Sequence, residues 1–105
     1  MSEKEYIYYL TLGRKDRFRY YHDLIQGKIV RFVVQYEAYI NGSWYPIIRY
    51  DTAHGHPHKD ILHPNKPQEK IEFHGYSTDD VLTLGERDIK ENWQRYRVKY
   101  EQEMK

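Results

Sequence analysis

The chain contains no cysteine, and this absence removes several kinds of chemistry at once. Without thiols there is no disulfide framework, no thiolate nucleophile and no zinc site built on sulfur. Long apolar runs are also missing, since no stretch approaches the ~20 apolar residues that a membrane-spanning helix needs. Charged residues interrupt residues 1–12, where a secretory signal would need an apolar run. We therefore expect a cytoplasmic protein that has no membrane partner.

An excess of charge of one sign is missing too. Seventeen basic and sixteen acidic side chains give a formal net charge of +1. No global field therefore points to a polyanionic partner, and any surface for nucleic acid has to be local. The 105 residues have the usual length of a single domain, and the aromatic side chains, among them twelve tyrosines, supply the apolar area for one modest core.

The clearest pattern in the chain is that of a β-hairpin. Residues 28–40 alternate between apolar and polar side chains, as a strand with one buried face does. Asn41 and Gly42 tolerate positive φ and predict a two-residue turn, after which residues 43–51 return as the partner strand. Pro46 indicates that this return strand lies at an edge of the sheet or carries a bulge.

The segments around the hairpin have weaker patterns. Residues 6–12 and residues 68–74 each favour a short strand. Residues 13–26 are polar, basic and poorly periodic, so a loop and a short helix both remain open. Residues 52–67 are rich in proline and histidine, which predicts a long irregular excursion of the kind that is usually functional or mobile.

The end of the chain predicts a long amphipathic helix. Ser77 and Asp80 form a capping-box pattern, and we expect helix over at least residues 80–100. Gly85 is the one local argument against continuity. Apolar residues recur at helical spacing and are assigned to the core: Leu82, Ile89, Trp93, Tyr96 and Tyr100. The predicted fold is α+β, a curved antiparallel β-meander of about four strands with this helix packed on one face.

The hairpin register makes a prediction about Arg49 and Asp51. With a two-residue turn, Val34 faces Arg49 and Phe32 faces Asp51, so both charged side chains share the core face of the sheet. Polar residues at positions where apolar ones are expected often mark a site. Two alternatives stay open. One is an ion pair between Arg49 and Asp51 that caps the edge of the core, and the other is a three-residue turn or a bulge at Pro46, either of which turns both residues outward.

Four of the six histidines follow directly: His54, His56, His58 and His63. Imidazole can take and give a proton near neutral pH and is also a common metal ligand. In a catalytic interpretation, His54 and His58 act as base and acid on a phosphodiester, with Arg49 or Lys59 stabilising the charge that develops on phosphorus.

A second interpretation is a metal site. His54, His56 and His58, together with Asp51 and the more distant His63, would offer nitrogen and oxygen ligands to zinc or nickel. Neither spacing is a strong motif, and a polar surface loop without chemistry is the third possibility. Because the loop offers no thiolate and its glycine and prolines disturb a regular projection of ligands, we expect no cofactor and less than one equivalent of tightly held transition metal.

A basic segment near the start of the chain is the second candidate for contact with RNA. Guanidinium groups and aromatic rings can together hold phosphates and stack bases. The alternative is a solvated basic loop whose aromatic rings turn inward. The residues predicted to bind RNA are Arg14, Lys15, Arg17, Arg19 and, from the histidine-rich loop, Lys59.

One short motif lies in the middle of the chain. It is the run Arg49-Tyr50-Asp51-Thr52-Ala53-His54-Gly55 with His58 after it. A second motif lies in the predicted carboxy-terminal helix and consists of Asp88-Ile89 and Asn92-Trp93. This pattern resembles the TumE-like toxins of prokaryotic toxin-antitoxin modules. The resemblance extends over residues 34–93. It implies a compact α+β toxin that acts on RNA and is neutralised by a separate antitoxin protein.

Two hypotheses about function follow. The first is a metal-independent endoribonuclease toxin that uses His54, His58, Arg49 and Asp51, with RNA and a cognate antitoxin as partners. The second is a non-catalytic interaction domain whose histidine-rich loop binds a metal ion or a protein. The sequence is compatible with a homodimer and does not require one.

Overall fold

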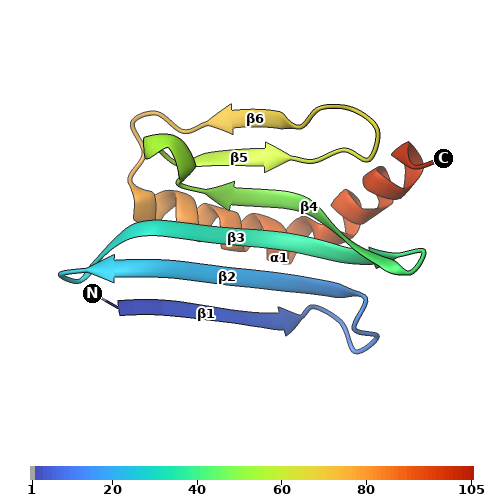
Figure 1. Cartoon of the computed structure of the whole chain (residues 1–105), viewed down its shortest axis with the longest axis horizontal. Coiled ribbons are helices and arrows are strands. Elements are labelled where there is room, and N and C mark those ends of the chain that lie inside the picture. Colours follow the sequence, from blue (N-terminus) through green and yellow to red (C-terminus); the bar gives the residue numbers. More distant parts are fainter. Residues whose placement is uncertain (1) are drawn as a thin grey trace.

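The protein folds into one antiparallel sheet with a single long helix on one face (Figure 1). The computed structural model describes residues 2–105, apart from the side chain of His54. The strands lie side by side in chain order, which is a meander. They are β1 (Ser2–Tyr9), β2 (Asp16–Ile25), β3 (Lys28–Ile40), β4 (Ser43–Asp51), β5 (His58–Ile61) and β6 (Glu69–Glu72). The α+β class and the meander are confirmed, but the sheet has six strands where we expected about four.

The first additional strand is β2, in the segment for which we weighed a loop against a short helix. Both expectations are wrong. Phe18 and Tyr20 are buried on the face covered by the helix, whereas Arg17 and Arg19, which alternate with them, point to the opposite face. This is the period of two that defines a strand.

The second additional strand is β5, which lies inside the segment predicted to be irregular. A short 3-10 helix, η1 (Ala53–Gly55), turns the chain at the end of β4. β5 then pairs antiparallel with β4, with Arg49 opposite Asp60 and Asp51 opposite His58. The excursion over residues 52–67 is therefore partly regular, and it returns the histidine-rich segment to the sheet.

The helix α1 (Thr78–Glu103) confirms the prediction made from its capping box and apolar spacing. The Ser77 hydroxyl accepts a hydrogen bond from the Asp80 backbone N–H at 3.1 Å. α1 packs on β3 and β4, where the Trp93 ring lies 6.0 Å from that of Tyr36. Ile89 is fully buried in the core between helix and sheet. Among the described residues, no helix combines the length and the hydrophobicity needed to span a membrane.

Gly85 does not interrupt α1, because it marks the point where the helix comes closest to the sheet. A Cβ atom at this position would lie 2.8 Å from Cγ of Tyr50 and 3.0 Å from Cγ2 of Val34. No real Cβ contact is that short, so only glycine lets the helix rest on β3 and β4 at this distance.

A β-bulge between β3 and β4 changes the register that we predicted for the hairpin. The register shifts between Tyr36 and Glu37: Glu37 pairs with Pro46 and Tyr36 pairs with Ile48, which leaves Ile47 as the extra residue. The bulge that Pro46 indicated is thus present, and β4 lies between β3 and β5 and is not an edge strand.

The bulge moves the charged residues of β4 to the other face. Arg49 lies opposite Gln35 and Asp51 lies opposite Val33, so the predicted pairs with Val34 and Phe32 are wrong. Since one inserted residue inverts every side chain after it, both charged residues leave the core and point away from α1.

The close approach at Gly85 yields a prediction. Replacement of Gly85 by Ala should lower the free energy of unfolding by about 1–3 kcal/mol through overpacking against Tyr50 and Val34, although alanine is the better helix former by roughly 1 kcal/mol. Urea denaturation measures the change. The control is Thr83→Ala on an exposed turn of the same helix, which should stay within about 0.5 kcal/mol of wild type. A G85A variant as stable as wild type would contradict this packing.

Candidate functional site

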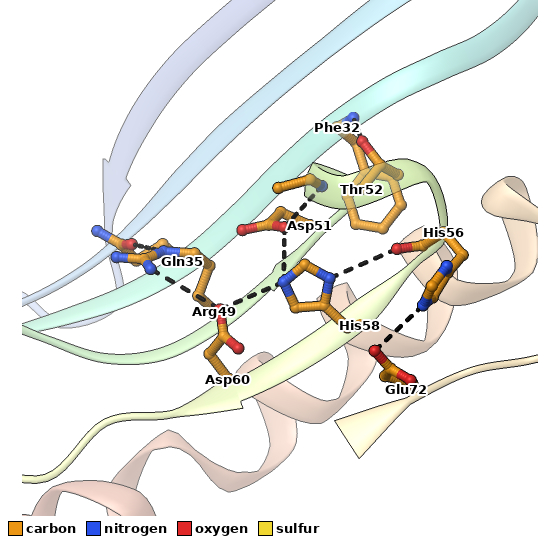
Figure 2. A network of polar contacts seen from close by, with 10 residues as sticks. Phe32, Gln35, Arg49, Asp51, Thr52, His56, His58, Asp60 and Glu72 are labelled. Atoms are coloured by element: carbon orange, nitrogen blue, oxygen red, sulfur yellow. Dashed lines mark hydrogen bonds and ion pairs between the residues drawn. The ribbon is translucent and has the colours of Figure 1, made fainter. Parts of the chain in front are cut away.

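Polar side chains from four neighbouring strands form one network on the face of the sheet opposite α1. It consists of guanidinium, carboxylate, amide and imidazole groups, and Figure 2 shows the part of it around His58. Its acidic members are almost inaccessible, with Glu37 5%, Asp51 7% and Asp60 3% exposed. Buried charges are rare unless they are paired, so a network of this kind has a structural or a functional reason. The members are Arg17, Arg19, Gln35, Glu37, Arg49, Asp51, His58 and Asp60.

His58 is at the centre of the part of the network that carries the predicted catalytic residues. Its Nε2 atom lies 2.9 Å from Oδ1 of Asp51 and 3.4 Å from Oδ2 of Asp60. Its Nδ1 atom faces the carbonyl oxygen of His56 at 3.4 Å. Nη1 of Arg49 lies 3.8 Å from the same Asp60 oxygen (Figure 2). The imidazole, which is 3% exposed, is therefore oriented by two carboxylates with a guanidinium beside them.

Arg49 connects this cluster to the rest of the network. Its Nε atom donates a hydrogen bond to Oε1 of Gln35 at 2.7 Å, and the Gln35 amide donates in turn to Glu37. Arg17 and Arg19 donate to the two oxygens of Glu37 from β2, at 2.5 and 3.0 Å. These hydrogen bonds thus run from β2 to β4 and restrict the rotamer of each side chain that takes part. The ion pair between Arg49 and Asp60 extends the network to β5.

The carboxyl group of Glu37 is the anchor on the β2 side. Burial alone would raise its pKa, but hydrogen bonds from Arg19, Arg17 and Gln35 hold that pKa below its usual value of 4.5. Glu37 is therefore ionised at neutral pH and neutralises part of the charge of two arginines in a site that is poorly exposed to water.

Two features beside His58 depart from ordinary packing. Oδ1 of Asp60 is buried without a hydrogen-bond partner among the described residues, which is costly for a carboxylate. On the other side of the cluster, a hollow of about 210 Å³ lies next to Asp51. Arg31 and Tyr21 contribute to its wall. His58 is thus enclosed by its partners, and the hollow lies beside one of them, Asp51.

The structure brings together three of the four residues that the sequence predicts as catalytic. Arg49, Asp51 and His58 belong to one cluster, and the side chain of His54 lies outside the described part of the chain. The alternative of an Arg49–Asp51 ion pair is replaced by two other pairs, because Arg49 faces Asp60 and Asp51 faces His58. Sequence reasoning missed Asp60, although its spacing of two residues from His58 is that of one face of a strand.

Lys59 lies on the other face of the sheet, in the core under α1. Its Nζ atom is 3.2 Å from Oδ2 of Asp88 and donates to the Tyr96 hydroxyl at 3.0 Å. Burial would raise the pKa of Asp88, but hydrogen bonds from Tyr50 and Tyr96 and the charge of Lys59 keep that pKa below its usual value. Lys59 therefore neutralises a half-buried carboxylate, and it does not join the other residues predicted to bind RNA.

The remaining residues predicted to bind RNA are divided between two places. Arg14 and Lys15 are exposed in the turn between β1 and β2, whereas Arg17 and Arg19 are members of the polar network. The guanidinium of Arg17 also lies over the Trp44 ring, 3.8 Å from its centroid. Both network arginines are thus already paired with Glu37, and their exposed surface is limited.

The other histidines have separate partners. His63 lies 2.6 Å from carboxylate oxygens of both Glu69 and Glu103, away from the polar network. His56 approaches Glu72 at 3.2 Å, and so does His74 at 3.0 Å. Hydrogen bonds from His56 and then His74 lower the pKa of Glu72.

Two groups of described residues bring potential metal ligands within 4.8 Å of one another. One is Asp51, His58 and Asp60, and the other is His56, Glu72 and His74. The predicted set of His54, His56 and His58 is therefore divided: His56 and His58 belong to different groups, and the side chain of His54 is not described.

Fold and site together define a small α+β domain in which a six-stranded meander carries a buried histidine, carboxylate and arginine network on the face opposite its single helix. Residues 1–105 match the family described as a domain of unknown function, DUF7718, and the chain belongs to this family. No curated protein and no solved structure matches it.

The role of Glu37 yields a prediction about acid stability. A carboxyl group with a lowered folded-state pKa contributes stability that is present above the unfolded-state pKa and is lost as the pH falls through the folded-state value. The free energy of unfolding should therefore decline as the pH is lowered below 4.5, the ordinary pKa of a glutamate. Glu37→Gln should flatten this decline and cost about 1–3 kcal/mol at pH 7.

Urea titrations between pH 3 and 7 measure both effects. The matched control is Glu101→Gln, which removes a half-buried i,i+4 pair with Arg97 at 3.2 Å and should change stability by about 0.5 kcal/mol or less. If the two variants behave alike, Glu37 does not anchor the network.

Proposed function

We propose that this chain is a metal-independent endoribonuclease of the toxin-antitoxin type, with its site at the Arg49, Asp51, His58 and Asp60 cluster. The observation that carries the proposal is the position of the His58 imidazole. It is held by Asp51 and Asp60 while Arg49 lies beside Asp60. A histidine oriented by carboxylates next to a guanidinium is the combination that acid-base cleavage of a phosphodiester needs.

The proposed reaction uses the ribose as its own nucleophile. A base removes the proton of the 2′-hydroxyl, the 2′-oxygen attacks phosphorus, and the bond from phosphorus to the 5′-oxygen breaks. An acid gives that oxygen a proton, so the products are a 2′,3′-cyclic phosphate and a 5′-hydroxyl end. His58 takes one of the two proton-transfer roles and His54 the other, while Arg49 stabilises the negative charge on the phosphorane.

The surroundings of the cluster support binding of an RNA strand beside Asp51. The adjoining hollow is lined by Tyr21 and by Arg31, whose side chain is 63% exposed and also pairs with Asp23 at 2.7 Å. A guanidinium can hold a phosphate and a tyrosine ring can stack on a base. The formal net charge is only +1, so we expect weak, local contacts with RNA.

The toxin interpretation implies a second proposed partner, an antitoxin protein that covers this face of the sheet.

The alternative function is a binding module without catalysis. A different observation favours it: His56, Glu72 and His74 form a group of potential metal ligands outside the proposed catalytic cluster.

The most specific prediction concerns the 2′-hydroxyl. Purified protein should cleave single-stranded RNA in the presence of EDTA and leave 2′,3′-cyclic phosphate ends. It should not cleave the same sequence made as DNA or with 2′-O-methyl groups, because these lack the nucleophile. Electrophoresis and mass spectrometry of the products distinguish these outcomes. Cleavage of DNA, or the absence of cleavage in any RNA, would refute the proposed reaction.

A second prediction concerns variants of the residues that we propose as catalytic. His58→Gln, His54→Ala and Arg49→Ala should each reduce RNA cleavage by about 10²- to 10⁴-fold, and each should abolish growth inhibition when expressed without an antitoxin. Arg87→Ala on the exposed surface of α1 is the control and should retain full activity.

The stability of these variants needs a separate measurement. His58 belongs to the segment that we predicted to be irregular, but it is buried and held by two carboxylates. Removing it should cost about 1–3 kcal/mol because Asp51 and Asp60 lose their partner. Activity should therefore be compared at a temperature where thermal melts show every variant folded. Full activity of a folded His58 variant would exclude this residue from the reaction.

A further inference from the structure

We propose that His56, Glu72 and His74 form a binding site for a zinc ion, separate from the Asp51, His58 and Asp60 cluster. The three residues come from three segments: the loop after η1, strand β6, and the loop between β6 and α1. Their ligand atoms lie within 4.8 Å of one another. This inference does not depend on the ribonuclease proposal, and either can fail without the other.

The register of β5 and β6 explains why these residues meet. His58 pairs with Glu72, and the Phe73 backbone N–H donates to the Pro57 carbonyl at 3.0 Å, which continues the ladder by one residue. Continuing the same register by one further residue puts His56 opposite His74. Because Glu72 and His74 are two residues apart, they share a face, which is the face that points away from α1.

The side chains already have the orientation that a shared ion requires. Nε2 of His56 lies 3.2 Å from one oxygen of Glu72, and Nε2 of His74 lies 3.0 Å from the other. The two imidazole rings are 4.7 Å apart between centroids. Both rings are thus directed at one carboxylate, so little conformational entropy remains to be lost when an ion binds.

The ligand chemistry and the exposure favour zinc. Two imidazole nitrogens and a carboxylate oxygen are a typical ligand set for Zn²⁺, whereas Mg²⁺ prefers oxygen ligands in an octahedral shell. His56, Glu72 and His74 have 40%, 45% and 70% of their side-chain surface exposed, so an ion can enter from solvent. Three protein ligands leave a tetrahedral ion one position for water or for a ligand.

The sequence could not assemble this site, because only His56 belongs to the histidine-rich loop. We expected no tight metal on the ground that this loop projects its ligands irregularly. Glu72 and His74 reach the same point from β6 and the segment after it. The site also adjoins the catalytic cluster, since the carbonyl oxygen of His56 faces Nδ1 of His58 at 3.4 Å. An ion bound here would fix the backbone that holds one side of the His58 ring.

Isothermal titration calorimetry with ZnCl₂ on the full chain tests the proposal. Wild type should bind one equivalent of zinc and should show no heat of binding with MgCl₂. Glu72→Gln and His74→Ala should each weaken zinc binding by at least about 10- to 100-fold, since even residues that only support a metal ligand have effects of that size. At one zinc concentration, the rise in melting temperature should also be larger for wild type than for either variant.

The matched control is His22→Gln, which removes a histidine on β2 outside this group and should bind zinc like wild type. Because Glu72 and His74 are exposed, their variants should fold, and their melting curves without zinc verify this. The proposal is overturned if wild type binds no zinc. It is equally overturned if E72Q and H74A bind one equivalent with wild-type affinity, since the ion then has other ligands.

Discussion

The β-bulge at Ile47 is the feature on which the arrangement of the site depends. Without the extra residue, Arg49 would point into the core beside Val34, where its charge would have no partner and α1 could not pack. With it, Arg49 and Asp51 face away from the helix while Ile48 and Tyr50 take their places in the core. The one inserted residue therefore places charged side chains on the outer face and apolar side chains on the core face, because side chains alternate with a period of two.

Once Arg49 and Asp51 have this orientation, the neighbouring strands supply their partners. β3 contributes Gln35 and Glu37, and β5 contributes His58 and Asp60. Each of these pairs consists of residues i and i+2, which a strand places on the same face. Charged groups are buried at little cost only where a neighbour of opposite charge or a hydrogen-bond partner matches them.

Much of the fold could be predicted because strong local signals agreed. The alternation in β3, the Asn41-Gly42 turn and the Ser77 cap each correspond to a single structure, and all three are confirmed. β2 was missed because its outward positions are arginines, so that Phe18 and its inward neighbours were hidden in a basic segment. Gly85 was interpreted as a weakness of the helix, since close contact with another element is not visible from local sequence.

Less of the site could be predicted, because several of its residues are far apart along the chain and meet only through strand pairing. The sequence indicated Arg49, Asp51 and His58 because they lie close together in one motif. It did not indicate Glu72, which reaches the histidines only through strand pairing. The burial of Glu37 could not be foreseen either, because it depends on arginines about twenty residues earlier in the chain.

The two neighbouring clusters for which we propose different functions have separate geometries. Asp51 and Asp60 orient the imidazole from one side, and the backbone of His56 faces it from the other. A rigid support of this kind is what a proton-transferring group needs in order to keep its geometry through a reaction. The exposed side chain of His56 is at the same time directed toward Glu72, on the outer side of the same segment.

NMR titration of isotope-labelled protein with a single-stranded RNA analogue tests most directly whether RNA binds the face of the sheet that carries His58. The 2′-hydroxyls of this analogue are replaced by hydrogen, so that it binds without being cleaved. The account predicts that the largest chemical-shift changes occur at Arg31, Asp51 and the His58 ring, with none at Val98 on the outer surface of α1. Changes confined to the helix, or no change at saturating RNA concentration, would contradict the assignment of the site to this face of the sheet.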